Sequence, residues 1–143
     1  MRILALDLGT RRVGVALSDP LGLTAQGLPT IERRGRKGFI EAVRGLVEAH
    51  GVERVVLGLP LNMNGTPGPR AEEALAFARE LGEALGIPVD TWDERMTTVA
   101  AERALAEGRV RGSKKRQLVD RIAAQLILEG YIESIKHAPP RNE

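Results

Sequence analysis

Short apolar runs alternate with turn residues through the first part of the chain. The run from Arg2 to Leu8 is mostly apolar and stops at a Gly-Thr pair, which predicts a buried strand. A second run, from Val13 to Ser18, stops at an Asp-Pro pair. A third segment, from Thr24 to Glu32, spaces threonine and isoleucine with glycine and proline. The tight turn between the first two runs favours an antiparallel meander of three strands.

The hydrophobic period then changes to that of helices. Apolar residues recur at helical spacing from Phe39 to Val47, and the pattern ends at the pair His50-Gly51, a typical helix C-terminus. The remaining expected elements are, in order, a strand at 54–59, a helix at 70–85, a strand at 87–92, a helix from Thr97 or Thr98 to Glu107, and a last helix at 115–135. This order of strands and helices predicts an α/β fold.

Length and composition limit the class of protein. The chain has 143 residues, 43% of them hydrophobic, so we expect one domain over residues 1–137 and a flexible tail over 138–143. It has no cysteine, and His50 and His137 lie far apart, which argues against zinc sites and cysteine or histidine triads. No apolar run approaches the ~20 residues of a membrane span, and no signal peptide is visible, so we expect a cytoplasmic protein.

Charge is unevenly distributed although the net charge is only +2. Residues 66–107 carry four basic and nine acidic side chains, whereas residues 108–121 carry six basic and one acidic. A shorter basic run, Ile31 to Gly38, has four basic side chains and one acidic. Charge runs are often solvated surface, but two basic segments beside an acidic one also favour a polyanionic partner. The larger segment, expected to follow a nucleic-acid backbone, contains Arg109, Arg111, Lys114, Lys115 and Arg116.

Three carboxylates stand at positions where apolar residues are expected. Asp7 ends the first strand, and Glu94 directly follows the strand at 87–92. Asp120 aligns with Ala123 and Ile127 on a helix that turns about 100° per residue, so it points away from the polar stripe. A turn cap at Asp7, a helix cap at Glu94 and a salt bridge at Asp120 are the structural alternatives.

These carboxylates also have the chemistry of a metal site. Parallel strands in an open α/β sheet present their carboxyl ends to one crevice, so we expect Asp7 and Glu94 to converge there. The last helix is expected to bring Asp120 across to them. Three carboxylates together require a cation, and oxygen ligands without histidine or cysteine favour Mg²⁺ or Mn²⁺. Beside basic segments, such a site indicates metal-assisted hydrolysis of phosphodiester bonds.

Four motifs, in order, resemble those of the YqgF family. They are DLGTRRVG at 7–14, GLPLNMNG at 58–65, DERMTT at 93–98 and K-x-x-x-V-D-x-x-A-A at 115–124. The resemblance covers residues 1 to about 135. It implies an RNase H-like fold with a five-stranded sheet, a divalent-metal nuclease site and a role in maturing the 5′ end of 16S rRNA. On the matching positions it makes Asp7, Glu94 and Asp120 the catalytic and metal-binding acids.

One departure concerns the fourth strand. Resolvases of similar fold have an acid at its end, where this chain has Gly58-Leu59-Pro60-Leu61. Glu94 must then take the place of that acid.

Arginines near the expected crevice are candidates for phosphate binding. Arg11 and Arg12 lie in the turn after Asp7, and Arg95 follows Glu94. The planar guanidinium suits bidentate phosphate contact, so we expect Arg12 or Arg95 to hold the scissile phosphate, unless either pairs with Asp7 or Glu94. The glycine-rich segment 64–68 is either a phosphate-binding loop or a plain turn.

The partner is expected to be nucleic acid, most simply precursor rRNA, with the ribosome as a further partner and a monomer or weak homodimer as the assembly. A Holliday-junction resolvase is the first alternative, and it requires a stable dimer because symmetric cutting needs two active sites. An RNA-binding domain that cuts slowly or not at all is the second. The Asp-x-Gly-Thr hairpin also resembles that of actin-like ATPases, which need two such domains.

Overall fold

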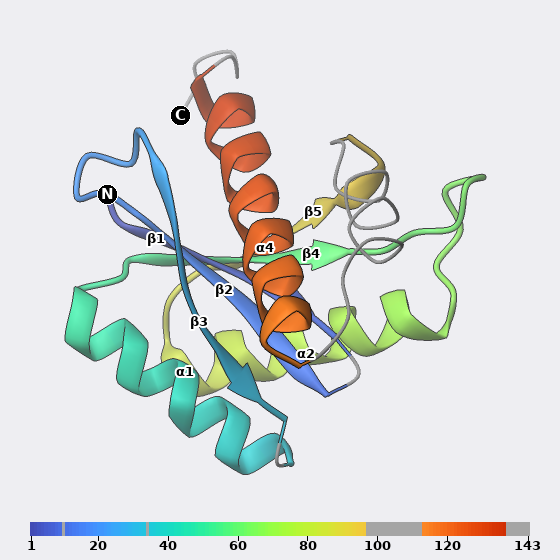
Figure 1. Ribbon diagram of the computed structural model, residues 1–143, viewed down its shortest axis with the longest axis horizontal. Coiled ribbons are helices and arrows are strands. Elements are labelled where there is room, and N and C mark those ends of the chain that lie inside the picture. The colour runs from blue at the N-terminus through green and yellow to red at the C-terminus, as the bar shows by residue number, and fades with distance from the viewer. Residues whose placement is uncertain (10, 34, 97–112, 137–143) are drawn as a thin grey trace.

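The computed structural model describes residues 1–9, 11–33, 35–96 and 113–136. A five-stranded mixed sheet lies at its centre, with strand order β3-β2-β1-β4-β5 (Figure 1). The strands are β1 (Ile3–Leu8), β2 (Arg12–Ser18), β3 (Ala25–Glu32), β4 (Arg54–Leu59) and β5 (Val89–Asp93). β1, β2 and β3 pair antiparallel, whereas β4 is parallel to both β1 and β5. The meander predicted for the first three strands is confirmed.

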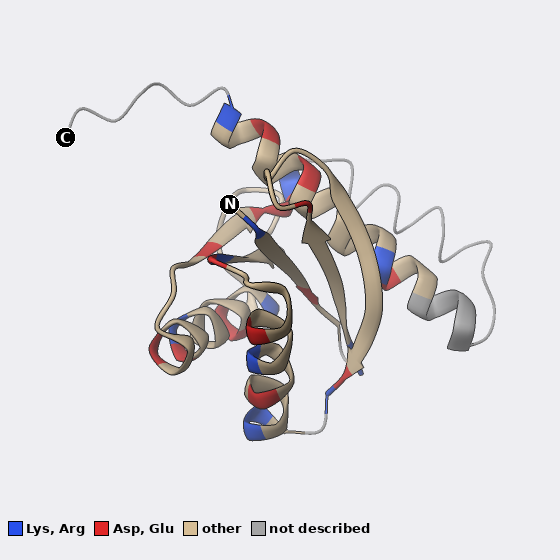
Figure 2. Cartoon of the chain, turned by 90° about the vertical axis from the view of Figure 1, so that its left-hand side faces the viewer, with Lys and Arg blue, Asp and Glu red and all other residues tan. Residues whose placement is uncertain are grey.

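Helices cover both faces of the sheet. α1 (Arg36–His50) and α2 (Pro69–Leu85) lie on one face, and α4 (Ser113–Lys136) crosses the other (Figure 2). Both α1 and α2 end at a glycine, Gly51 or Gly86, in the left-handed conformation, as the sequence predicts. A short 3₁₀ turn, η1 (Glu94–Met96), follows β5. The predicted helix beginning at Thr97 or Thr98, and the predicted tail over 138–143, lie outside the described residues.

Each face of the sheet has its own hydrophobic core. Alternate residues of a strand point to opposite faces, so Leu4, Leu6 and Leu8 of β1 pack towards α1 and α2. Ile3 and Ala5 of the same strand pack against the buried side of α4, which includes Ala124. The alternation of β1 therefore assigns the next residue in the second series, Asp7, to the α4 face.

A polar contact fixes α4 to the far edge of the sheet. Tyr131 of α4 donates a hydrogen bond to Asp90 of β5. Arg54 of β4 donates from Nη1 to the Tyr131 hydroxyl at 3.0 Å and to Asp90 Oδ2 at 3.2 Å. Trp92 packs edge-to-face on Tyr131, with ring centroids 6.3 Å apart. These contacts orient α4 across the sheet.

Within the described residues, no helix is long and apolar enough to cross a membrane.

Candidate active site at the ends of the parallel strands

Two carboxylates are buried where parallel strands end. Asp7 of β1 is 4% exposed and Glu94, the first residue of η1, is 6% exposed. β1 and β5 are both parallel to β4, so these residues come at the same edge of the sheet. Glu94 follows Trp92 by two positions, and Trp92 packs in the core beneath α4. The site therefore lies on the α4 face.

The Glu94 side chain covers the end of β4. A Cβ built on Gly58 would lie 3.2 Å from Glu94 Oε1 and 2.5 Å from Ile127 Cδ1 of α4. The pairing of β1 with β4 runs to Leu6 and Leu57, so Asp7 and Gly58 come next in the two strands. The glycine thus leaves room for the Glu94 carboxylate of η1 over β4, beside the strand that carries Asp7. The role of Glu94 as the replacement for an acid at the end of the fourth strand stays a prediction.

Helix α4 reaches the same end of the sheet through Gly14. This glycine pairs with Asp7 across β1 and β2. A Cβ built on it would lie 2.1 Å from the main-chain oxygen of Asp120 and 3.4 Å from Cβ of Ala124. Asp120 is half-buried, whereas Ala123, one turn further along the helix, is buried. The predicted inward face of the last helix is confirmed, and Asp120 lies at its edge.

Metal binding by these three acids stays a prediction. Among the described residues, no three acidic, histidine or cysteine side chains are grouped so that they hold a metal ion. The donor chemistry fits the predicted ion, since Asp7 and Glu94 are buried carboxylates and the main chain of Asp120 packs against Gly14, the partner of Asp7 in β2.

Arg95 is held by the neighbouring Asp93. Its Nε donates to both carboxylate oxygens at 3.1 Å, and its Nη2 donates to Oδ2 at 2.8 Å. These hydrogen bonds hold the pKa of the Asp93 carboxyl below its ordinary value. Arg95 Nη1 also donates to the main-chain oxygen of Met63 at 3.2 Å. This last hydrogen bond joins η1 to the β4–α2 loop, and the Arg95 side chain stays 37% exposed. Phosphate binding by Arg95 remains a prediction.

The glycine-rich segment closes on itself as a turn. The Gly65 N–H donates to the Asn62 oxygen at 2.8 Å, and the Thr66 N–H donates to Asn64 Oδ1 at 3.1 Å. The Asn62 N–H in turn donates to the Thr66 oxygen at 2.9 Å. These N–H groups are satisfied within the loop, so the structure favours the plain turn over a phosphate-binding loop.

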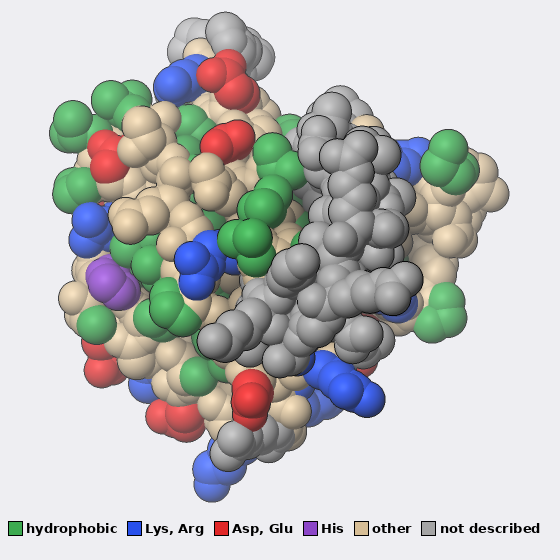
Figure 3. Space-filling model, in the orientation of Figure 1, with side chains coloured by type: hydrophobic (Ala, Val, Ile, Leu, Met, Phe, Trp, Pro, Cys, Tyr) green, Lys and Arg blue, Asp and Glu red, His purple; other side chains and the backbone are tan. Residues whose placement is uncertain are grey.

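The structure describes the side chains of only some of the other predicted basic residues. Arg11 is exposed and Arg12 is half-buried, both in or beside the turn after Asp7. Arg109 and Arg111 lie outside the described residues. Lys114, Lys115 and Arg116 belong to the first turns of α4, but their side chains lie outside the description. On the face that carries α4, described hydrophobic and charged side chains are interspersed (Figure 3), so what is visible there is not uniformly basic.

Sequence reasoning missed the two glycines that shape this site. Gly14 allows α4 to approach β2, and Gly58 makes room for Glu94. Both stand within the motifs at 7–14 and 58–65, and both occupy positions on the face that alternation assigns to α4. A small residue on that face was the available signal, and its meaning depends on which helix covers the sheet.

Comparisons with known proteins agree with this picture. The model of the family described as "RuvX: Holliday junction resolvase" matches residues 1–134. A protein of Moorella thermoacetica is 53% identical over 135 residues, covering 94% of this chain and 96% of the relative. One of Myxococcus xanthus is 49% identical over 140 residues, covering 98% and 91%. Both are named as candidate pre-16S rRNA nucleases.

Solved structures share the fold at low sequence identity. T. thermophilus RuvC in complex with Holliday junction substrate superposes with a TM-score of 0.60 at 16% identity, covering 99% of each chain. The fowlpox virus Holliday junction resolvase gives 0.53 at 16% identity, covering 94% of this chain and 99% of that one. The RNase H-like fold predicted from the sequence is therefore confirmed, and the relatives bear out a nuclease as the enzyme class. The chain belongs to the RuvX family, which is the YqgF family that its four motifs resemble.

Proposed function

We propose that this protein is a nuclease dependent on Mg²⁺ or Mn²⁺ that hydrolyses a phosphodiester bond at the 5′ end of precursor 16S rRNA, in the cytoplasm. The observation that carries the proposal is the burial of Asp7 and Glu94 at one edge and on one face of the sheet, with α4 packed beside them. Carboxylate oxygens at the carboxyl ends of parallel strands are the kind of ligand that a hard divalent cation takes. The relatives named for this substrate match over nearly their whole length.

The acids and the basic residues have separate tasks in this proposal. Asp7, Glu94 and Asp120 would hold the divalent ion, which when bound activates water and stabilises the departing oxygen. The core beneath α4 keeps two of these carboxylates out of bulk solvent, which strengthens their attraction for a cation. Arg11 and Arg12, in and beside the turn after Asp7, would contact phosphates that flank the cut.

The first test separates cleavage from binding. Asp7→Asn and Asp120→Asn should abolish Mg²⁺- or Mn²⁺-dependent cleavage of a precursor rRNA fragment, because each removes a charge from the ion site. RNA affinity, measured by fluorescence anisotropy, should not weaken. Asp19→Asn is the matched control, since Asp19 lies in the β2–β3 turn at the opposite edge of the sheet, and it should cut at the wild-type rate. Equal cleavage by all three variants would identify a contaminating nuclease and leave an RNA-binding domain.

A second candidate function is cleavage of four-way DNA junctions, favoured by the description of the RuvX family as Holliday junction resolvases. Its chemistry would be the same, but symmetric cutting needs two sites and hence a stable dimer. Rates on single-stranded RNA, on a duplex rRNA end and on a four-way junction should be compared, with the mass measured in solution. We expect the rRNA end to be cut fastest by a monomer or weak homodimer. Fastest cutting of the junction by a stable dimer would favour the resolvase. Binding to the ribosome belongs to the same proposal and is tested by co-sedimentation.

A further inference from the structure

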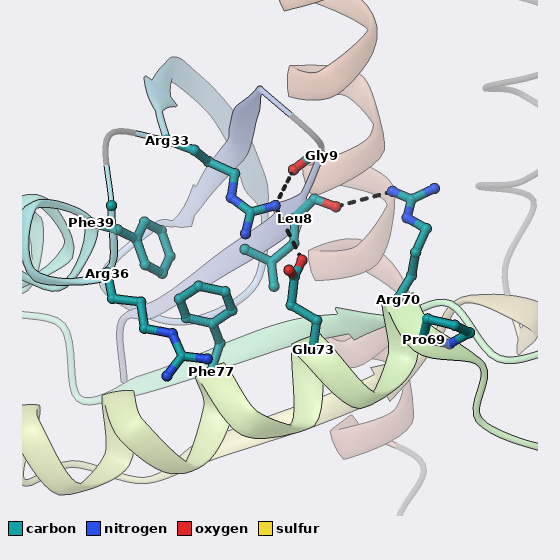
Figure 4. A pocket seen from close by; sticks show the side chains of 10 residues that line it. Leu8, Gly9, Arg33, Arg36, Phe39, Pro69, Arg70, Glu73 and Phe77 are labelled. Atoms are coloured by element: carbon teal, nitrogen blue, oxygen red, sulfur yellow. Dashed lines mark hydrogen bonds and ion pairs between the residues drawn. The ribbon is translucent and has the colours of Figure 1, made fainter.

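A cavity with basic lining residues lies on the face of the sheet opposite Asp7 and Glu94. It has a volume of about 570 Å³ and is bordered by the C-terminal end of β1, the start of α1 and the start of α2. Leu8 lines it, whereas the preceding Asp7 is assigned to the α4 face. Three arginines line the cavity, Arg33, Arg36 and Arg70 (Figure 4). The cavity is therefore distinct from the proposed active site, although both adjoin the end of β1.

Main-chain carbonyls fix two of these arginines. Arg33 donates from Nη1 to the oxygen of Gly9 at 2.7 Å, and Arg70 donates from Nη2 to the oxygen of Leu8 at 3.2 Å. A guanidinium group has five N–H donors. The bonds to the main-chain carbonyls use only Nη1 of Arg33 and only Nη2 of Arg70. The arginines are thus positioned in advance, and they keep further donors for a ligand.

The floor of the cavity is aromatic and buried. Phe39 and Phe77 pack edge-to-face with centroids 5.2 Å apart, and both are at most 5% exposed. The guanidinium carbons of Arg33 and Arg36 lie 5.4 and 5.6 Å from the centroid of Phe77. These contacts hold the two cations over an apolar surface, where their charge is less screened than in open water.

Basic side chains outnumber acidic ones in the described lining of the cavity. Glu73 is the one carboxylate among these residues, and it accepts a hydrogen bond from Arg33 at 3.1 Å. Arg36 is paired with Glu80, which lies outside the lining, at 2.6 Å. Two helices also begin here, since Gly35 precedes α1, and Pro69 and Arg70 open α2. Neither start has a side-chain cap, and main-chain N–H groups at helix starts favour anions.

We propose that this cavity binds the phosphate group of a nucleotide, either a free mononucleotide or the end of an RNA strand. Three arginines suit an anion with several acceptor oxygens, because planar guanidinium groups bind phosphate bidentately. The volume falls in the range of sites for small ligands. The buried phenyl rings hold the guanidinium groups of Arg33 and Arg36 in place. Binding here does not depend on cleavage, so it goes beyond the proposed function.

Calorimetric titration with inorganic phosphate and with adenosine 5′-monophosphate tests the proposal. Arg36→Gln should weaken binding roughly three- to tenfold, because Arg36 is exposed and its phosphate contact is partly screened. Glu73→Gln should strengthen binding by a similar factor, since it removes the competing charge beside Arg33. Arg44→Gln is the matched control. It removes the same charge from α1 outside the cavity, and should leave the affinity within about twofold of wild type.

Several outcomes decide the proposal. Absence of saturable binding to the wild-type protein at millimolar phosphate and mononucleotide would overturn it, as would equal weakening by Arg36→Gln and Arg44→Gln. Thermal unfolding without ligand should show that the variants are folded. The source of the phosphate is identified with oligonucleotides that carry a 5′-phosphate, compared with the same strands carrying a 5′-hydroxyl and with the mononucleotide. Tighter binding of the phosphorylated strand than of the mononucleotide indicates the end of an RNA strand. Tighter binding of the mononucleotide indicates a free nucleotide. Asp7→Asn should bind phosphate in this cavity as tightly as wild type does. Phosphate binding and nuclease activity can then fail independently of each other.

Discussion

Replacing Gly14 with alanine should move α4 and destabilise the protein. The new Cβ would lie 2.1 Å from the oxygen and 2.8 Å from the carbon of the Asp120 carbonyl, both main-chain atoms that cannot rotate away. The helix must retreat by about 1 Å to restore van der Waals contact, although Tyr131 and its partners hold its other end. Overpacking of a core costs roughly 1–3 kcal/mol. Because the obstacle is main chain, we expect a loss of about 2–3 kcal/mol of unfolding free energy, and Tm lower by roughly 5–10 °C.

Gly45→Ala is the matched control, and its effect should have the opposite sign. Gly45 lies inside α1, and a Cβ built on it meets nothing within 4 Å. Alanine is favoured over glycine within a helix by roughly 0.5–1 kcal/mol, so this variant should be slightly more stable than wild type. Urea unfolding followed by circular dichroism gives both values. If Gly14→Ala proves as stable as Gly45→Ala, the close packing of α4 on β2 is wrong, and with it the placement of Asp120 beside the strand of Asp7.

Two further predictions concern other parts of the fold. Tyr131→Phe removes the hydroxyl that donates to Asp90 and accepts from Arg54, and urea unfolding should show a loss of about 1–2 kcal/mol. An unchanged stability would mean that this contact does not anchor α4. Hydrogen bonds from main-chain N–H groups, chiefly that of Thr24, lower the pKa of Asp19 from 3.8 to about 2. The folded-state pKa lies below that of the unfolded chain, so Asp19 stabilises the fold above about pH 4, and this contribution is lost as the pH falls towards 2. Asp19→Asn should therefore flatten the acid limb of stability against pH, and a carboxyl that titrates near 3.8 by NMR would contradict this reasoning.

The fold could be predicted closely because its signals are local. The apolar run at Arg54–Leu59 has the same bounds in the structure as in the prediction, and the helix ends at Gly51 and Gly86 follow from glycine in the left-handed conformation. The strand predicted at 87–92 is instead Val89–Asp93. Its pairing with β4 runs from Val55 to Leu59, so the partner strand determines where it starts and stops. Strand bounds depend on such partners, which local periodicity does not contain.

The candidate site also has features that the sequence predicted and one that it did not. Helical periodicity was enough to identify the buried face of the last helix, and strand order was enough to bring Asp7 and Glu94 to one end of the sheet. The partner of Arg95 was not predictable, because Asp93, Asp7 and Glu94 were all acids within reach of a flexible side chain. The structure pairs it with Asp93.

The sequence by itself determined the order of the described elements, the buried face of the last helix and the type of chemistry, since all three follow from residue type and spacing along the chain. Only the tertiary structure decided the close approaches: the Asp120 carbonyl against Gly14, the Glu94 carboxylate over Gly58, and Arg33 beside Gly9 in the arginine-lined cavity. Each joins residues more than 20 positions apart. Their distances depend on how closely a helix, a strand or a turn packs on the sheet, and this is a property of the assembled core, not of any segment alone.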